Sequence, residues 1–273
     1  MASSKNKKPK KSSVRRKSDN ICNICQEQTE LTKDHVPPKT CQKFSQVLIH
    51  KLLSDSKTDK GFSPQIGQNG LYYKTICPDC NNNILGGKYD KYLGDFTKNI
   101  ESLIKSSIMI PGKISVRCYP NAIARSLLGH LLAAKTETDE VVLDQLIRPC
   151  VLDETISIPS SINIFYWIYP YKNIKVIRDF AMVSCTNTTR NFGYFNLLKF
   201  YPVAFLIAHD LEEYDNLDSL KDFKNMPFDQ EAEISIKLNP IRYSNWPEDI
   251  NNTNRFLLFG QSTFNDSVNV TPR

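Results

Sequence analysis

The stretch TICPDCNNNILGGKYDKYL, residues 75–93, joins a strand, a cysteine pair and the start of a helix. The segment LYYKTIC (71–77) is aromatic and β-branched, which predicts a strand. After the second cysteine, apolar residues recur at three- and four-residue spacings from Ile84 to Ile108, which predicts a helix that ends before Pro111. The stretch therefore predicts a strand and a helix with two cysteines at their junction.

Two Cys-x-x-Cys pairs predict one tetrahedral zinc site, formed by Cys22, Cys25, Cys77 and Cys80. Two intervening residues let both thiolates of a pair reach one ion, and no thioredoxin-like context favours a redox pair. Four cysteines fill the coordination sphere, so we expect a structural zinc rather than a catalytic one. The other cysteines are expected to be small buried residues: Cys41, Cys118, Cys150 and Cys185.

The stretch LTKDHVPPKT (31–40) lies between the two cysteine pairs. A shared zinc ion would bring it close to Asn81, which directly follows Cys80. Asp34 and the amide oxygen of Asn81 are hard ligands suited to Mg²⁺ or a similar ion, and His35 is a candidate base for an attacking water. Adjacent strand residues face opposite ways, so Asp34 and His35 need a turn near the two prolines to serve one site.

The order of CNIC (22–25), LTKDHVPPK (31–39) and residues 75–93 resembles the HNH, or ββα-metal, endonuclease family. The resemblance covers about residues 20–97, a third of the chain, and its motifs are specific in combination. It implies a ββα core, stapled here by zinc, that hydrolyses phosphodiester bonds with the help of a divalent ion.

The resemblance also implies roles for single residues. His35 would activate water, Asp34 would help to hold the divalent metal, and Asn81 would occupy the last motif position, where many members have histidine. Asparagine at that position is similar to the zinc-stapled Holliday-junction resolvases of phages. The middle motif position stays open, because Asn69 is the nearest asparagine and Tyr72 lies closer to the usual offset.

Other polar residues near this unit have alternative interpretations. Asp90 lies nine residues after Asn81 on the same predicted helix and is an alternative second metal ligand. Lys39 and Lys88 flank the predicted site, where they either hold phosphates as point charges or are solvated surface lysines. The remaining histidines lack a partnered motif and are expected to be structural: His50, His130 and His209.

Positive charge is concentrated in residues 1–18, MASSKNKKPKKSSVRRKS, which hold eight basic residues and no acid. Without these eight charges, the net charge of the chain falls from +6 to −2. A segment of this composition is expected to be disordered, and either to contact phosphates or to act as a solubilising tail or nuclear-type address. The candidate phosphate contacts in it are Lys7, Lys8, Lys10, Lys11, Arg15 and Arg16.

The spacing of apolar residues in the remainder predicts helices over 44–55 and 121–135, with a loop over 56–70. From about residue 155, aromatic and β-branched runs alternate with turn residues, which predicts a mainly antiparallel sheet. The fold class is therefore α+β. We expect three units: a disordered tail (1–18), a zinc-stabilised nuclease unit (19–109) and an α+β accessory domain for specificity, sensing or oligomerisation (110–273).

These features predict a metal-dependent endonuclease acting on DNA, with structural Zn²⁺ and catalytic Mg²⁺ or Mn²⁺. The alternative is a non-catalytic zinc module that binds nucleic acid or a protein partner. By analogy with small bacterial HNH proteins, the chain would be an antiviral defence or restriction effector with an associated sensor or ATPase subunit. No apolar run approaches the roughly 20 residues of a membrane span and no secretory signal is visible, so we expect a cytoplasmic protein. The choice between DNA and RNA and a homo-oligomeric state stay open.

Overall fold

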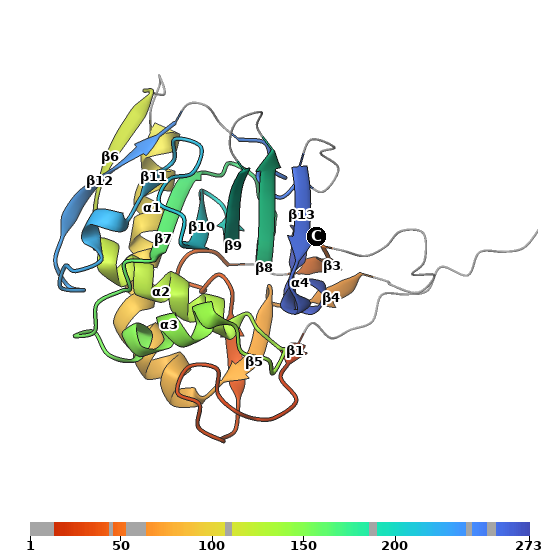
Figure 1. Cartoon of the computed structure of the whole chain (residues 1–273). Helices are drawn as coiled ribbons and strands as arrows, with labels where there is room; N and C mark the ends of the chain where they lie inside the picture. Colours follow the sequence, from red (N-terminus) through yellow and green to blue (C-terminus); the bar gives the residue numbers. More distant parts are fainter. Residues whose placement is uncertain are drawn as a thin grey trace, which may run out of the picture.

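The computed structural model describes residues 14–43, 46–52, 64–106, 111–185, 190–238, 242–249 and 255–273. These residues form an α+β fold with mainly antiparallel sheets, which confirms the predicted fold class (Figure 1). Among the helices in these ranges, none is long and apolar enough to cross a membrane.

The described chain contains helices mainly in its middle third and strands on both sides of them. The helices are η1 (Cys80–Tyr89, a π-helix), α1 (Asp90–Ser106), α2 (Pro120–Ala133), α3 (Val142–Leu152), η2 (Lys221–Phe223, a 3-10 helix) and α4 (Gln261–Asp266). The strands of the first half are β1 (Val14–Arg16), β2 (Thr32–His35), β3 (Val47–Lys51), β4 (Gln65–Gly67), β5 (Tyr72–Ile76) and β6 (Lys113–Cys118). Those of the second half are β7 (Ile162–Ile168), β8 (Ile174–Cys185), β9 (Arg190–Phe200), β10 (Val203–His209), β11 (Asp218–Ser219), β12 (Ala232–Lys237), β13 (Arg255–Phe259) and β14 (Val268–Pro272).

The strands form one large sheet and two small ones. The large sheet has nine strands in the order β11-β7-β10-β9-β8-β14-β3-β4, with β13 also paired to β8. A three-stranded sheet has the order β1-β5-β2, and β6 pairs with β12 in the third. The pair β1–β5 is parallel, whereas β2 and β5 are antiparallel. The three-stranded sheet, its adjoining loops and η1 carry the two cysteine pairs and the predicted catalytic residues, so this part of the fold positions the candidate site.

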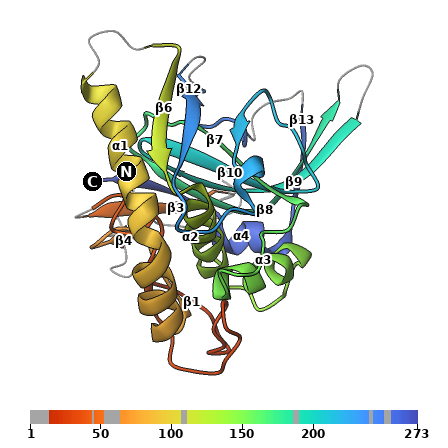
Figure 2. The same ribbon diagram turned by 90° about the vertical axis from the view of Figure 1, so that its left-hand side faces the viewer.

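Helix α2 lies at the centre of the molecule, and all of its residues are buried. Pro120 is its first residue, a position where the missing amide proton of proline costs no hydrogen bond. The helix contacts α1, which stands upright in Figure 2, together with η1, α3, β5 and β9. Because it touches both the small sheet and the large sheet, α2 connects the cysteine-rich unit to the remainder of the fold.

The predicted helix over 44–55 is wrong where the structure describes it, because Val47–Lys51 form strand β3. Val47 and Ile49 are buried whereas Leu48 and His50 are half-buried, which is the alternation of a strand. The partner strand β14 comes from the opposite end of the chain. Residues 44–45 and 53–55 of this prediction lie outside the described residues.

The predicted disordered tail extends too far, because Val14–Arg16 form β1 and pair with β5. The guanidinium of Arg15 lies 6.0 Å from the ring centroid of Tyr73 and also donates a hydrogen bond to the carbonyl of Asn265. These contacts order the end of a segment whose composition alone predicts disorder. Four of its predicted phosphate contacts lie outside the described residues: Lys7, Lys8, Lys10 and Lys11.

The segment 19–109 contributes strands to two sheets. Its strands β2 and β5 belong to the three-stranded sheet, whereas β3 and β4 extend the large sheet through β14. One cluster of buried apolar side chains runs through both parts of the chain, from Cys22 to Val270. The cysteine-rich unit and the C-terminal sheet therefore share a hydrophobic core.

Candidate functional site

The four paired cysteines come together as the sequence predicts. The Sγ atoms of Cys22, Cys25, Cys77 and Cys80 all lie within 4.8 Å of one another, and those of Cys25 and Cys77 are 3.8 Å apart. The amide of Cys77 donates to Sγ of Cys22 over 3.3 Å, and the amide of Cys80 donates to Sγ of Cys77 over 3.4 Å. Four converging sulfur ligands supported by backbone donors can hold a metal ion such as zinc.

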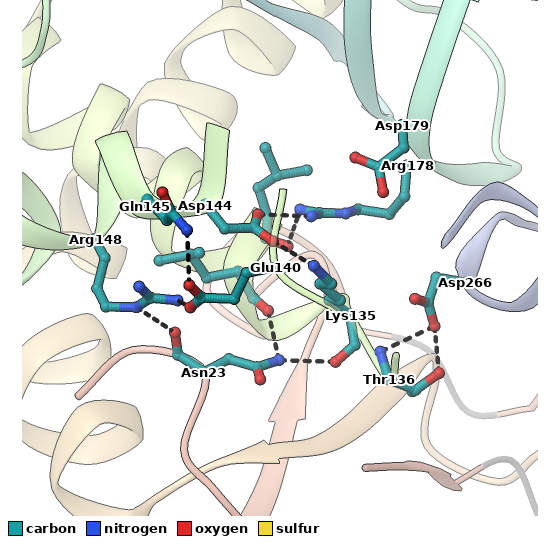
Figure 3. Close-up of polar contacts among 12 residues, drawn as sticks. Asn23, Lys135, Thr136, Glu140, Asp144, Gln145, Arg148, Arg178, Asp179 and Asp266 are labelled. Atoms are coloured by element: carbon teal, nitrogen blue, oxygen red, sulfur yellow. Dashed lines mark hydrogen bonds and ion pairs between the residues drawn. The ribbon is translucent and has the colours of Figure 1, made fainter. Parts of the chain in front are cut away.

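The first cysteine loop is anchored to the end of α2 (Figure 3). Nδ2 of Asn23 donates to the carbonyls of Leu132 and Lys135 over 2.9 and 2.7 Å, which satisfies acceptors that the end of a helix leaves free. Arg148 of α3 donates to the carbonyl of Asn23 over 3.1 Å. The cysteine cluster is therefore fixed to the central helix and to its neighbour α3.

The same end of α2 is joined to the large sheet by a buried ion-pair network (Figure 3). The Asp144 carboxylate accepts from Lys135 over 2.6 Å and from Arg178 of β8 over 2.8 Å. Thr136 donates to Asp266 from both its amide and its hydroxyl. Burial opposes ionisation of Asp144, but the charges of Arg178 and Lys135 outweigh it and lower the pKa of this carboxyl below its usual range. Asp144 therefore stays ionised at neutral pH, and its ion pairs join the end of α2, helix α3 and strand β8.

Asp34 belongs to a buried triad with His130 of α2 and Asp90 of α1. Nδ1 of His130 lies 2.9 Å from Oδ2 of Asp34, and Nε2 lies 2.9 Å from Oδ1 of Asp90. Ser126 donates to the same oxygen of Asp90 over 2.8 Å. All three members of the triad are buried. His130, expected to be a structural residue without a partner motif, thus connects the predicted ligand Asp34 to the alternative ligand Asp90.

The charges of this triad favour a protonated His130. Burial acts to lower its pKa, but the two neighbouring carboxylates raise it to about 10. Burial raises the pKa of Asp34 above its usual range, although His130 acts in the opposite direction. An imidazolium between two carboxylates donates from both ring nitrogens, so the triad joins β2, α1 and α2 through charge-assisted hydrogen bonds.

Asn81 lies at the start of η1 and is bonded to β2. Its Nδ2 donates to Oγ1 of Thr32 over 3.0 Å and to the carbonyl of Lys33 over 2.9 Å. The Asp34 carboxylate accepts from His130 and from the amide of His35. Among the described residues, the four cysteines form the one group of three or more histidine, cysteine or acidic side chains whose ligand atoms lie close enough together to hold a metal ion. The Asp34 carboxylate and the Asn81 amide nitrogen thus have protein partners in this arrangement, and their role as ligands of a catalytic Mg²⁺ or Mn²⁺ stays a prediction.

His35 faces away from Asp34, as adjacent residues on a strand do. It lines a pocket of about 240 Å³ together with Lys39, Lys43 and Asn69. The backbone of Asn69 hydrogen-bonds the ring, whereas Nε2 is buried and has no partner in the described part of the chain. Of the two candidates for the middle motif position, Asn69 has the backbone that bonds the ring, and which of Asn69 and Tyr72 fills that position stays a prediction.

The environment of His35 keeps its ring neutral. Burial lowers its pKa to about 4, and the positive charge of Lys39 adds to this effect. A neutral ring that donates from Nδ1 has its lone pair on Nε2, the nitrogen without a partner. This is the protonation state that a general base needs before reaction.

The loop after His35 is fixed on α1. Oγ1 of Thr40 donates to the carbonyl of Asp90 over 3.0 Å. A Cβ atom added to Gly94 would lie 2.6 Å from Cβ of Thr40, so only glycine allows this close approach. The contact places Lys39 and Lys43 beside the pocket. Lys43 and Gln42 line it as well, and no motif in the sequence marks either residue.

The predicted phosphate contacts separate in the structure. Lys39 lines the His35 pocket and is exposed. Lys88 instead forms an ion pair with Glu154 over 2.5 Å, and this hydrogen bond raises its pKa. Arg16 of β1 is exposed, whereas Arg15 contacts Tyr73. Lys39 and Arg16 are therefore the described members of this set that present charge to solvent near the small sheet.

Four cysteines outside the two pairs are expected to be small buried residues. Three of them have described side chains. Cys118 and Cys150 are buried and Cys41 is half-buried, and all three are free thiols. Burial raises the pKa of Cys150 to about 11, so the thiol stays protonated. The side chain of Cys185 lies outside the described part of the chain.

Comparison with protein families, with curated proteins and with solved structures found no match to this chain. The functional conclusion therefore depends on the cysteine cluster, the buried triad and the His35 pocket.

Proposed function

We propose that the chain is an HNH-type endonuclease that hydrolyses phosphodiester bonds in DNA, with His35 as the general base. The observation that carries this proposal is the environment of the His35 ring. The Asn69 backbone bonds one ring nitrogen, the other lacks a partner among the described residues, and Lys39 and Lys43 line the same pocket. A neutral imidazole of fixed tautomer beside two cations suits attack by water on an anionic phosphodiester.

In the proposed reaction, a water molecule gives a proton to Nε2 of His35 as its oxygen attacks phosphorus. One P–O ester bond breaks, and the leaving oxygen takes up a proton from solvent. The Asn69 backbone contact stabilises the imidazolium that forms, as an acceptor on the second nitrogen does in other His-dependent hydrolases. Lys39 and Lys43 place positive charge where negative charge develops on the phosphate.

We infer that the four cysteines hold zinc in a structural role. Four sulfur ligands fill a tetrahedral coordination sphere and leave no position for water. When bound, the ion would supply a cross-link between the loop before β2 and the start of η1. This cross-link would help to hold β2, which carries His35, against β5.

The activity test relies on His35, because Asp34 is a buried partner of His130 and its removal would disturb folding in any case. Purified full-length chain is incubated with plasmid DNA in Mg²⁺, in Mn²⁺ and in EDTA. We expect His35→Ala to lower the cleavage rate by about 10²- to 10⁴-fold, the usual contribution of a general base. His50→Ala is the matched control, because His50 is a half-buried histidine on β3 outside the pocket.

Zinc content and thermal unfolding are measured on both variants to show that the fold is retained. Equal nicking by wild type and His35→Ala would overturn the assignment of the base. Absence of cleavage by wild type under all three conditions would favour the non-catalytic zinc module.

A further inference from the structure

The outward face of the three-stranded sheet carries basic residues in register. Arg16 of β1 pairs with Lys74 of β5, and Lys74 pairs with Lys33 of β2. Residues paired across neighbouring strands lie on the same face of a sheet. The three cations therefore form one row across three strands, about 10 Å from end to end at the usual strand spacing.

This row lies beside the residue proposed as the base. Two residues along each strand, His35 pairs with Tyr72, and their ring centroids are 5.6 Å apart. Because side chains two residues apart share a face, His35 and Tyr72 lie on the same face as the basic row. Nζ of Lys33 lies 5.1 Å from the Tyr72 ring centroid and connects the two rows.

The basic face is accessible to solvent, whereas the opposite face is covered. Arg16 and Lys33 are exposed and Lys74 is half-exposed. On the opposite face, Thr75 donates to the carbonyl of Ala133 in α2, and Tyr73 donates to the carbonyl of Asp266. Glu30 is the acid paired with Lys74, at 3.9 Å, and its side chain is 86% exposed. Such a surface ion pair is weak, so it leaves the row positively charged.

We infer that this face binds the sugar–phosphate backbone of one DNA strand and directs it to the His35 pocket. The inference rests on the proposed nuclease function and names where its substrate lies. Charge complementarity supports this occupant, because the chain beyond residue 18 carries a net charge of −2, yet Lys33, Lys74, Lys39 and Lys43 gather around His35. A protein partner of average surface composition has no need of such a row, whereas phosphates supply an anion at each nucleotide.

The binding experiment uses the full chain carrying His35→Ala, so that a labelled 30-nucleotide DNA strand stays intact. Affinity is measured against salt concentration for this protein and for the same protein with Lys33→Glu and Lys74→Glu added. The control adds Lys98→Glu, an exposed lysine that belongs to α1 and not to the sheet. We expect the double charge reversal to weaken binding at least tenfold at low salt. The slope of log affinity against log salt concentration should fall by about 1.4, because each of the two lost phosphate contacts contributes about 0.7.

Lys98→Glu is expected to bind within twofold of its parent. Unchanged affinity and slope in the double variant would overturn the inference. In the wild-type background, Lys33→Glu with Lys74→Glu should raise KM for cleavage with little effect on kcat. Unchanged cleavage kinetics in that variant would reject the proposed binding surface but leave the nuclease function standing. If DNA binding depends on the basic row but the wild-type protein cleaves no DNA, the nuclease function is rejected and the binding surface stands.

Discussion

Asp34 and His35 are neighbours in sequence but have different surroundings. The strand turns Asp34 inward to His130 and turns His35 outward to its pocket. Their adjacency in the sequence predicts a ligand and a base at one metal ion, with a turn at the prolines to reorient them. In the structure both residues belong to β2, so the turn follows them and the inward carboxylate becomes a structural partner of α2.

At the same scale, the protonation of His35 can be tested directly by NMR of its ring. Because burial and then Lys39 lower its pKa to about 4 from 6.5, we expect neutral-ring signals from pH 8 down to pH 5. The unfolded ring takes up a proton near pH 6.5, so the contribution of His35 to stability is present above that pH and is lost as the pH falls toward 4. Lys39→Glu should raise the midpoint, since it replaces a cation with an anion. A wild-type midpoint near 6.5 would contradict this account.

The second residue-scale prediction concerns the triad. Asp34→Ala leaves the His130 imidazolium with Asp90 as its remaining carboxylate, and removal of one partner from a buried ion pair costs about 3–5 kcal/mol. Urea unfolding should therefore show a loss of this size in the free energy of unfolding. Glu30→Ala is the control, because its side chain is exposed and its removal should change stability by no more than about 0.5 kcal/mol. Equal stability of the two variants would show that the triad contributes little.

Among the elements, the cysteine loops could be predicted from sequence because their information is local. A Cys-x-x-Cys pair specifies a tight turn by itself, and both pairs meet as expected. Strand β3 could not be predicted in the same way. Its apolar residues fit a helical spacing, and what makes it a strand is pairing with β14, more than 200 residues later. The same limit applies to His130, since its partners Asp34 and Asp90 become neighbours only when α2 packs against β2 and α1.

The element-scale prediction is that the cysteine cluster holds one zinc ion per chain and that Cys80→Ser releases it. Metal binding to a site of this kind contributes directly to folding stability, so the variant should also unfold at least about 5 °C lower. Cys150→Ser is the matched control, because Cys150 is a buried cysteine outside the cluster whose thiol donates to the carbonyl of Ile147. Elemental analysis and thermal unfolding give the two readouts. Full zinc content in Cys80→Ser would contradict the assigned ligand set.

At the scale of the whole molecule, the C-terminal strand connects the predicted units. Strand β14 lies between β8 and β3, so it joins the sheet built after residue 110 to a strand from the cysteine-rich half. Asp266, just before it, accepts from Tyr73 behind the candidate substrate face and from Thr136 after α2. Composition predicts a boundary between two units near residue 110. The hydrophobic core, however, contains side chains from both sides of that position.

This connection predicts that deletion of residues 260–273 destabilises the whole protein, including the cysteine-rich half. The deletion removes the fully buried Val268 and Val270, each worth about 1.5–3 kcal/mol, and leaves β3 and β8 without their shared partner. We expect loss of cooperative urea unfolding together with loss of zinc, because Tyr73 and β3 lose their C-terminal contacts at once. Deletion of residues 272–273 alone is the control, since it removes one strand-end pair and the hydrogen bond from Arg273 to Gln46. Zinc retention and an unchanged unfolding midpoint in the longer deletion would instead show that the cysteine-rich half folds independently of the C-terminal strand.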